Sequence, residues 1–117
     1  MKYDVIVVHC PTSNCNLGSG AAPIRRFLKK GIRVALGTDV SGGHNASMLR
    51  VMQYTLQTSK LYQTFSLLKE PALKVSEAFY LATKSGGSFF GKCGCFEKGY
   101  QFDALVVNDA YLNAEKY

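Results

Sequence analysis

The sequence predicts an α/β protein in which parallel strands are joined by helices. Two short apolar runs, residues 4–8 (Asp-Val-Ile-Val-Val) and residues 32–36 (Ile-Arg-Val-Ala-Leu), have the composition of buried strands. A stretch with helical spacing separates them, and each run leads into a loop rich in glycine and hydroxyl residues. Because a helix lies between them, the two strands should be parallel neighbours joined by a right-handed crossover.

The helix between the strands is predicted from Ala22 or Pro23 to Lys30. Proline suits the first helical turn, the apolar side chains at positions 24, 27 and 28 share one face, and Gly31 is a good stop. Before this helix, residues 12–20 are dense in turn-forming residues and are expected to form a loop.

The second half of the chain is predicted to be mostly helical. Apolar spacing predicts one helix over residues 47–59 and another over residues 75–83, which breaks at the glycine pair 86–87. Residues 61–72 are weakly patterned and expected to be irregular. A last strand is predicted over residues 103–107 (Asp-Ala-Leu-Val-Val).

Composition is typical of one ordinary globular domain. The chain has 117 residues, of which 47% are hydrophobic and 19% charged, and no apolar run is long enough to span a bilayer. The N-terminus lacks the long apolar segment of a signal peptide, so we expect a soluble cytoplasmic protein with no membrane partner. In that compartment the 4 cysteines should be free thiols.

The cysteines and the basic charge each leave an alternative open. Cys10 and Cys15 form one close pair and Cys93 and Cys95 another, which together could bind a metal, although one intervening residue is tight for zinc. The net charge of +6 could indicate nucleic-acid binding. However, the basic residues are scattered apart from a cluster at positions 25–30, and no nucleic-acid-binding motif accompanies them, so no nucleic-acid partner is expected.

Asp39 is the acidic residue best placed for chemistry. It follows the strand over residues 32–36 through Gly37 and Thr38, and loops at the carboxyl ends of parallel strands converge on ligands. The structural alternative is an aspartate that caps the next helix or fixes the turn. His44 lies in the same loop and could touch a ligand or be merely structural.

Several motifs resemble the metal-dependent amidohydrolases that deaminate purines and related rings. They are His9-Cys10-Pro11-Thr12-Ser13-Asn14, Leu17-Gly18-Ser19-Gly20 and Leu36-Gly37-Thr38-Asp39-Val40-Ser41-Gly42-Gly43. The continuation is most similar to the guanine deaminases, through Ser76-Glu77-Ala78-Phe79, Phe90-Gly91 and Phe102-Asp103-Ala104. The resemblance covers nearly the whole chain.

This resemblance implies a fold and a reaction. Residues 1–91 would be the last two βα units of a TIM-type barrel, and residues 92–117 would begin the return to a small β domain. In that family a metal, usually zinc with iron as the alternative, activates water to attack the ring carbon that bears the amino group. The implied reaction hydrolyses guanine to xanthine and ammonia.

The family's site residues carry over position by position. The family's aspartate after the eighth barrel strand contacts the metal centre and exchanges protons with the attacking water, which implies both roles for Asp39. Ser13, Asn14 and His44 border the same mouth and are implied substrate contacts. The family's histidine at the position of His9 does not bind the metal.

The chain departs from the family pattern by what it lacks. The family's metal site draws on several further histidines and a glutamate, whereas this chain has 2 histidines, neither at a matching position. A catalytic zinc takes three or more protein ligands, so the chain alone is expected to be inactive. Its uncovered strand edges should pair with a complementing chain or a second copy. The alternative is a truncated, non-catalytic interaction protein or gene remnant.

Overall fold

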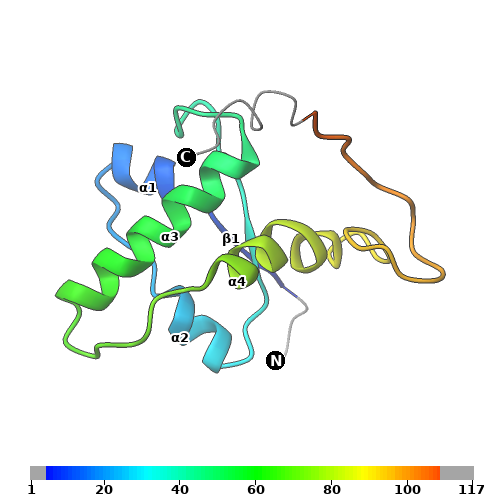
Figure 1. The fold of residues 1–117 in the computed structure, drawn as a ribbon. Coiled ribbons are helices and arrows are strands. Elements are labelled where there is room, and N and C mark those ends of the chain that lie inside the picture. Colours follow the sequence, from blue (N-terminus) through cyan, green and yellow to red (C-terminus); the bar gives the residue numbers. More distant parts are fainter. Residues whose placement is uncertain (1–4, 109–117) are drawn as a thin grey trace, which may run out of the picture.

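The computed structural model describes residues 5–108, and in it two short parallel strands are covered on one side by helices (Figure 1). The elements in chain order are β1 (Val7–His9), α1 (Pro11–Asn16), α2 (Ile24–Lys29), β2 (Val34–Leu36), α3 (Met48–Phe65), α4 (Val75–Tyr80) and a π-helical turn η1 (Leu81–Ser85). The predicted α/β class is confirmed.

The two strands pair in parallel, as the sequence predicts. Val7 lies opposite Val34 and His9 opposite Leu36. The Val7 amide donates to the Arg33 carbonyl at 2.9 Å, and the Gly37 amide donates to the His9 carbonyl at 3.0 Å. Each strand is shorter than its apolar run, because only the residues whose backbones hydrogen-bond to the neighbouring strand count as part of the sheet.

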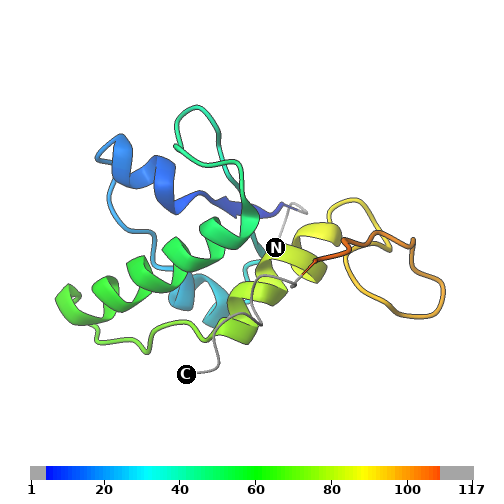
Figure 2. The ribbon, with the colours of Figure 1, turned by 45° about the horizontal axis from the view of Figure 1, so that its top comes forward.

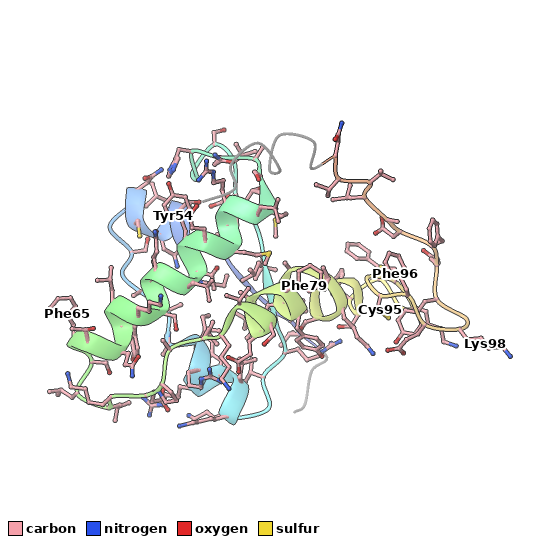
Figure 3. The ribbon with its side chains drawn as sticks, viewed as in Figure 1. Tyr54, Phe65, Phe79, Cys95, Phe96 and Lys98 are labelled. Atoms are coloured by element: carbon pink, nitrogen blue, oxygen red, sulfur yellow. The ribbon has the colours of Figure 1, made fainter. Side chains whose placement is uncertain are left out.

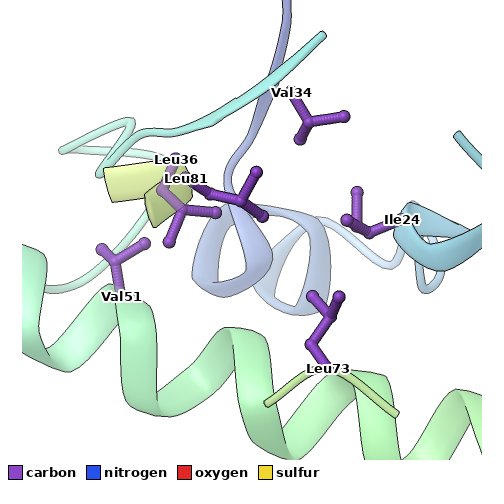
Figure 4. Close-up of a cluster of buried hydrophobic side chains, with 6 residues drawn as sticks. All are labelled: Ile24, Val34, Leu36, Val51, Leu73 and Leu81. Carbon is purple, nitrogen blue, oxygen red and sulfur yellow. The ribbon is translucent and has the colours of Figure 1, made fainter. Parts of the chain in front are cut away.

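The core lies between one face of this sheet and the helices (Figure 4). It consists of six buried apolar side chains, namely Ile24, Val34, Leu36, Val51, Leu73 and Leu81. Side chains alternate along a strand, so Val34 and Leu36 share the covered face. Their partners come from α2, α3, the segment before α4, and η1. Burial of each such side chain contributes on the order of 1.5–3 kcal/mol to the stability of the fold. Because the six side chains come from different elements, their packing holds these elements together.

The first part of the predicted loop after β1 is a helix, whereas residues 17–20 form turn and irregular structure as predicted. Pro11 occupies the first position of α1, where its fixed φ favours the helix and its missing amide costs nothing. The Asn14 amide donates to the Cys10 carbonyl at 3.0 Å, which starts the helical turn immediately after the strand. The hydroxyl and amide residues that suggested a loop here lie within a short helix.

The next long helix continues further than predicted. α3 runs to Phe65 through part of the segment expected to be irregular, although Phe65 is 79% exposed. The chain that returns from α3 packs against its last turns, because the Ser59 hydroxyl accepts the Leu73 amide at 2.9 Å and the Gln63 side chain accepts the Ala72 amide at 3.2 Å. These long-range contacts support helical turns that have no buried stripe of their own.

The predicted final strand is wrong. Residues 103–107 form neither helix nor strand, and in Figure 1 they belong to an extended segment that projects from the helices. Leu105 is 93% exposed and Val106 is 100% exposed. A strand needs a neighbouring strand for its backbone hydrogen bonds, and the described residues offer none here. The predicted division of the chain at residue 91 stays a prediction.

The second face of the sheet is apolar and partly open. A hollow of about 460 Å³ is lined by Ile6, Val8, Ala35, Leu36, Gly86, Phe89 and Phe90. Within it Val8 is 53% exposed and Phe90 is 78% exposed. The radius of gyration, 15.6 Å, exceeds the roughly 13 Å of a compact chain of this length, in keeping with a one-sided core and a projecting segment. No helix in the described part of the chain is long and apolar enough to cross a membrane.

Arg25 links α2 to the start of α4 on the side of the molecule where the strands begin. Its guanidinium binds both carboxylate oxygens of Glu77 at 2.6 and 2.7 Å, and it also donates to the carbonyls of Pro71 and Ala72. Glu77 in turn accepts the Lys74 amide at 2.7 Å. A bidentate pair with additional backbone acceptors is among the stronger ionic arrangements on a protein.

We expect Arg25→Ala to lower the free energy of unfolding by about 2 kcal/mol, because it leaves Glu77 and two carbonyls without their donor. The measurement is urea denaturation at neutral pH. The control is Lys84→Ala, which breaks an ion pair with Glu97 between side chains that are 38% and 54% exposed and should cost clearly less, because exposed ion pairs contribute little to stability. Equal losses for the two variants would contradict this interpretation.

Candidate active site at the carboxyl ends of the strands

Asp39 lies in a tight turn just beyond the end of β2. Its backbone is in the left-handed region, with φ at 45°, and its carbonyl accepts the Gly43 amide at 2.6 Å. The following helix, α3, is capped by Ser47 and not by Asp39. The aspartate's backbone therefore closes the turn, whereas its exposed carboxylate has a different partner.

That partner is Ser13 on α1. The Ser13 hydroxyl donates to Oδ2 of Asp39 at 2.5 Å, across 26 residues of sequence. Ser13 is 2% exposed, so its side chain is held by its surroundings. Because β1 and β2 are parallel, the segments that follow them emerge at the same edge of the sheet, and this pairing brings Ser13 and Asp39 together.

The loop after Asp39 packs tightly against α1. The Asn16 side-chain amide donates to the Gly42 carbonyl at 2.9 Å. A methyl group on Gly43 would lie 2.3 Å from the Thr38 carbonyl oxygen and 2.5 Å from the Thr12 hydroxyl. Gly43 therefore occupies a position that admits no side chain.

The residues at the end of β1 are electrostatically neutral. Burial lowers the pKa of His9 to about 4, and its Nδ1 has no hydrogen-bond partner within the described residues. Burial, followed by the negative charge of Asp39, raises the pKa of the neighbouring Cys10 thiol. At neutral pH His9 is thus an uncharged imidazole and Cys10 a protonated thiol.

The other predicted site residues, His44 and Asn14, have hydrogen-bond partners other than the Asp39 carboxylate. His44 is exposed and its Nε2 lies 3.2 Å from the hydroxyl of Tyr54 on α3, with the two rings edge to face at 5.3 Å. Tyr54 lies in the first half of α3 (Figure 3). Asn14 is half-buried on α1, and its carbonyl accepts the Ser19 amide. Substrate contacts by Ser13, Asn14 and His44 stay predictions.

Sequence reasoning missed Asn16, Gly43 and Tyr54. Asn16 lies 26 residues from the Gly42 carbonyl that it binds, and no local pattern marks that contact. The signal available for Gly43 was the glycine pair after Asp39, which a turn explains equally well.

The residues present fit one part of a metal site and not the whole. Asp39 offers a carboxylate oxygen, and carboxylates bind zinc and iron. Among residues 5–108, however, no group of three or more histidine, cysteine, aspartate or glutamate side chains could hold a metal ion. The four cysteines are free thiols, so the alternative of a four-cysteine site is not supported in the described part of the chain.

Comparison with known proteins assigns the chain to a family. The sequence profile of the Amidohydrolase family matches residues 2–116. The chain belongs to this family. The probable guanine deaminase of Schizosaccharomyces pombe is 40% identical over 114 residues, which are 95% of this chain and 21% of that protein. The guanine deaminase of Homo sapiens is 36% identical over 105 residues, which are 87% of this chain and 23% of that protein.

Solved structures of amidohydrolases agree with the sequence matches. A guanine deaminase from C. acetobutylicum, with guanine bound in its active site, superposes with a TM-score of 0.89 at 57% identity, over 97% of this chain and 27% of that one. A zinc-bound adenosine deaminase from Xanthomonas campestris superposes with a TM-score of 0.78 at 28% identity, over 92% of this chain and 25% of that one. This amidohydrolase chain thus spans about a fifth to a quarter of the length of the relatives it matches.

Gly43→Ala should destabilise the protein by about 1–3 kcal/mol, because the added methyl overlaps the Thr38 carbonyl and the Thr12 hydroxyl. Urea denaturation measures the effect. The control is Gly86→Ala, whose methyl would meet its nearest neighbours at 3.5 and 3.6 Å, an ordinary contact distance. A Gly43→Ala protein as stable as the Gly86→Ala protein would show that the loop does not pack as described.

The stability of the protein should fall as the pH drops from 6.5 toward 4. The pKa of His9 is about 4 in the folded protein against 6.5 when it is unperturbed, so the unfolded chain takes up the proton first. The contribution is complete above pH 6.5, and about 3 kcal/mol is lost by pH 4. His9→Gln should flatten this part of the profile of unfolding free energy. A profile unchanged by His9→Gln would contradict the assignment.

Proposed function

We propose that this chain supplies the last two βα units of a TIM-type amidohydrolase barrel that deaminates guanine to xanthine and ammonia. The observation that carries the proposal is the Asp39 carboxylate, bound by Ser13 where the carboxyl ends of two parallel strands meet. Enzymes built on parallel barrels place their reacting groups at this edge. Homologues named as guanine deaminases, at 36–57% identity, support guanine as the substrate.

Asp39 has a defined part in this proposal. A catalytic metal, zinc or alternatively iron, would lower the pKa of water and so provide a nucleophile near neutral pH. Ser13 occupies Oδ2 of Asp39, which leaves Oδ1 as the oxygen that would bind the metal or exchange a proton. In the proposed reaction Asp39 accepts a proton from the attacking water and returns it to the departing amino group, which leaves as ammonia.

The chain by itself is proposed to be inactive, because Asp39 is one donor and a catalytic zinc needs at least three protein ligands. The remaining ligands would come from the other strands of the barrel, supplied by another part of a longer chain or by a complementing polypeptide, and would cover the open face lined by Val8 and Phe90. We place the assembled enzyme in the cytoplasm, with Asn14 and His44 at the mouth of its purine site.

A second candidate function is favoured by the same open face. A chain that exposes Val8, Phe89 and Phe90 around one hollow could bind a partner without catalysing any reaction. This non-catalytic interaction protein has no use for an oriented carboxylate at Asp39. The chemistry of Asp39 therefore distinguishes the two candidates.

The proposal is tested in a chimera in which the 117 residues replace the matching segment of the C. acetobutylicum guanine deaminase. We expect the chimera to release ammonia from guanine and Asp39→Asn to lower kcat by about 10²- to 10⁴-fold, because the amide neither accepts the proton nor carries the charge. Ammonia release with guanine measures the rate.

The matched control is Glu70→Gln, which removes a carboxylate near Lys29, at the end of the molecule where the strands begin. Its kcat should stay within about twofold of the parent. A folded chimera that releases no ammonia, or one that keeps its activity after Asp39→Asn, would leave the interaction protein as the better candidate.

A further inference from the structure

We infer that Ser13 and Asn16 are positioning residues and that α1, which follows the neighbouring strand, sets the orientation of the Asp39 carboxylate. The inference deepens the proposed function and rests on it. It assigns roles to two residues of α1 that touch the Asp39 loop from outside that loop.

The first support is the Ser13 hydroxyl. It donates to Oδ2 of Asp39 at 2.5 Å, and a hydrogen bond to an ionised carboxylate is about twice as strong as one between neutral groups. Ser13 is 2% exposed, whereas Asp39 is exposed, so the buried partner fixes the rotation of the accessible one. The bond engages Oδ2 and leaves Oδ1 without a hydrogen bond from Ser13.

The second support is the Asn16 amide, which donates to the Gly42 carbonyl at 2.9 Å. A methyl group on Gly42 would lie 2.9 Å from the Ser13 hydroxyl oxygen and 3.0 Å from Oδ2 of Asp39. The backbone of the loop therefore lies directly against the Ser13–Asp39 pair. Asn16 holds this backbone in place while Ser13 holds the side chain.

Two hydrogen bonds from one short helix thus restrain the main chain and the carboxylate of the same loop. A ligating or proton-transferring carboxylate that is free to rotate spends less time in its productive orientation. Residues that support such groups without touching the substrate typically change activity or metal affinity by 10- to 100-fold when they are removed. Ser13 is positioned to have an effect of this size.

Thr12 provides a closely matched control. It precedes Ser13 on α1 and is also 2% exposed, but its hydroxyl has no hydrogen-bond partner among the residues that the structure describes. Thr12→Val keeps the branched shape of the side chain and replaces the hydroxyl with a methyl group. The comparison separates the loss of the Asp39 hydrogen bond from the loss of any buried hydroxyl on α1.

The test uses the same chimera. We expect Ser13→Ala to lower kcat about 10- to 100-fold with the KM for guanine within threefold of the parent, and Ser13→Thr, which keeps the hydroxyl, to recover most of the lost kcat. A second readout is independent of turnover: zinc transfer to a coloured chelator should be several-fold faster from Ser13→Ala than from the parent. Thr12→Val should match the parent in both measurements.

The inference is overturned if Ser13→Ala keeps the kcat and zinc transfer rate of the parent, or if Thr12→Val loses as much as Ser13→Ala. If Ser13→Ala does not fold, Asn16→Ala decides, because Asn16 is exposed: a several-fold fall in kcat with KM unchanged supports the inference, and an unchanged kcat overturns it. Failure of the proposed function is recognised separately, since Asp39→Asn would then leave ammonia release intact. If Asp39→Asn loses activity while Ser13→Ala and Asn16→Ala keep it, the proposed function stands and only the positioning roles of Ser13 and Asn16 are overturned.

Discussion

The parallel pairing of β1 with β2 is the interaction on which the rest of the structure depends. It aligns Val7 with Val34 and His9 with Leu36, so the chain leaves both strands at the same edge. α1 and the Asp39 loop are consequently neighbours although 26 residues separate Ser13 from Asp39. An antiparallel pair would send these two segments to opposite ends of the sheet.

The same pairing explains why one face of the sheet is a core and the other is a surface. Val34 and Leu36 point toward the helices and join the buried cluster, whereas Val8, opposite Ala35 on the other face, is half exposed. The helices lie mainly on the first face (Figures 1 and 2), and Gly86 reaches Ala35 on the second. A parallel sheet is normally buried on both faces, so the open apolar face is exceptional for strands of this kind.

Much of the fold could be predicted because local patterns encode it. The β-branched run ending at Val8, the helical spacing of Ile24, Phe27 and Leu28, and the stop at Gly31 together specify a strand-helix-strand unit. The errors occurred where a single residue or a distant contact overrode the pattern. Pro11 occupies the first turn of α1, where a loop was predicted. The Ser59 hydroxyl accepts the Leu73 amide and supports the end of α3. Residues 103–107 have no neighbouring strand among the described residues.

The sequence by itself determined that this is an amidohydrolase chain with a carboxylate at the end of a parallel strand, because motif spacing and apolar runs are local properties of a chain. It did not determine what holds Asp39. The Ser13 hydroxyl and the Asn16 amide are ordinary polar groups until the fold places them 2.5 Å from a carboxylate oxygen and 2.9 Å from a carbonyl. A hydrogen bond depends on distance and direction in space, and only the tertiary structure sets those for residues far apart in the sequence.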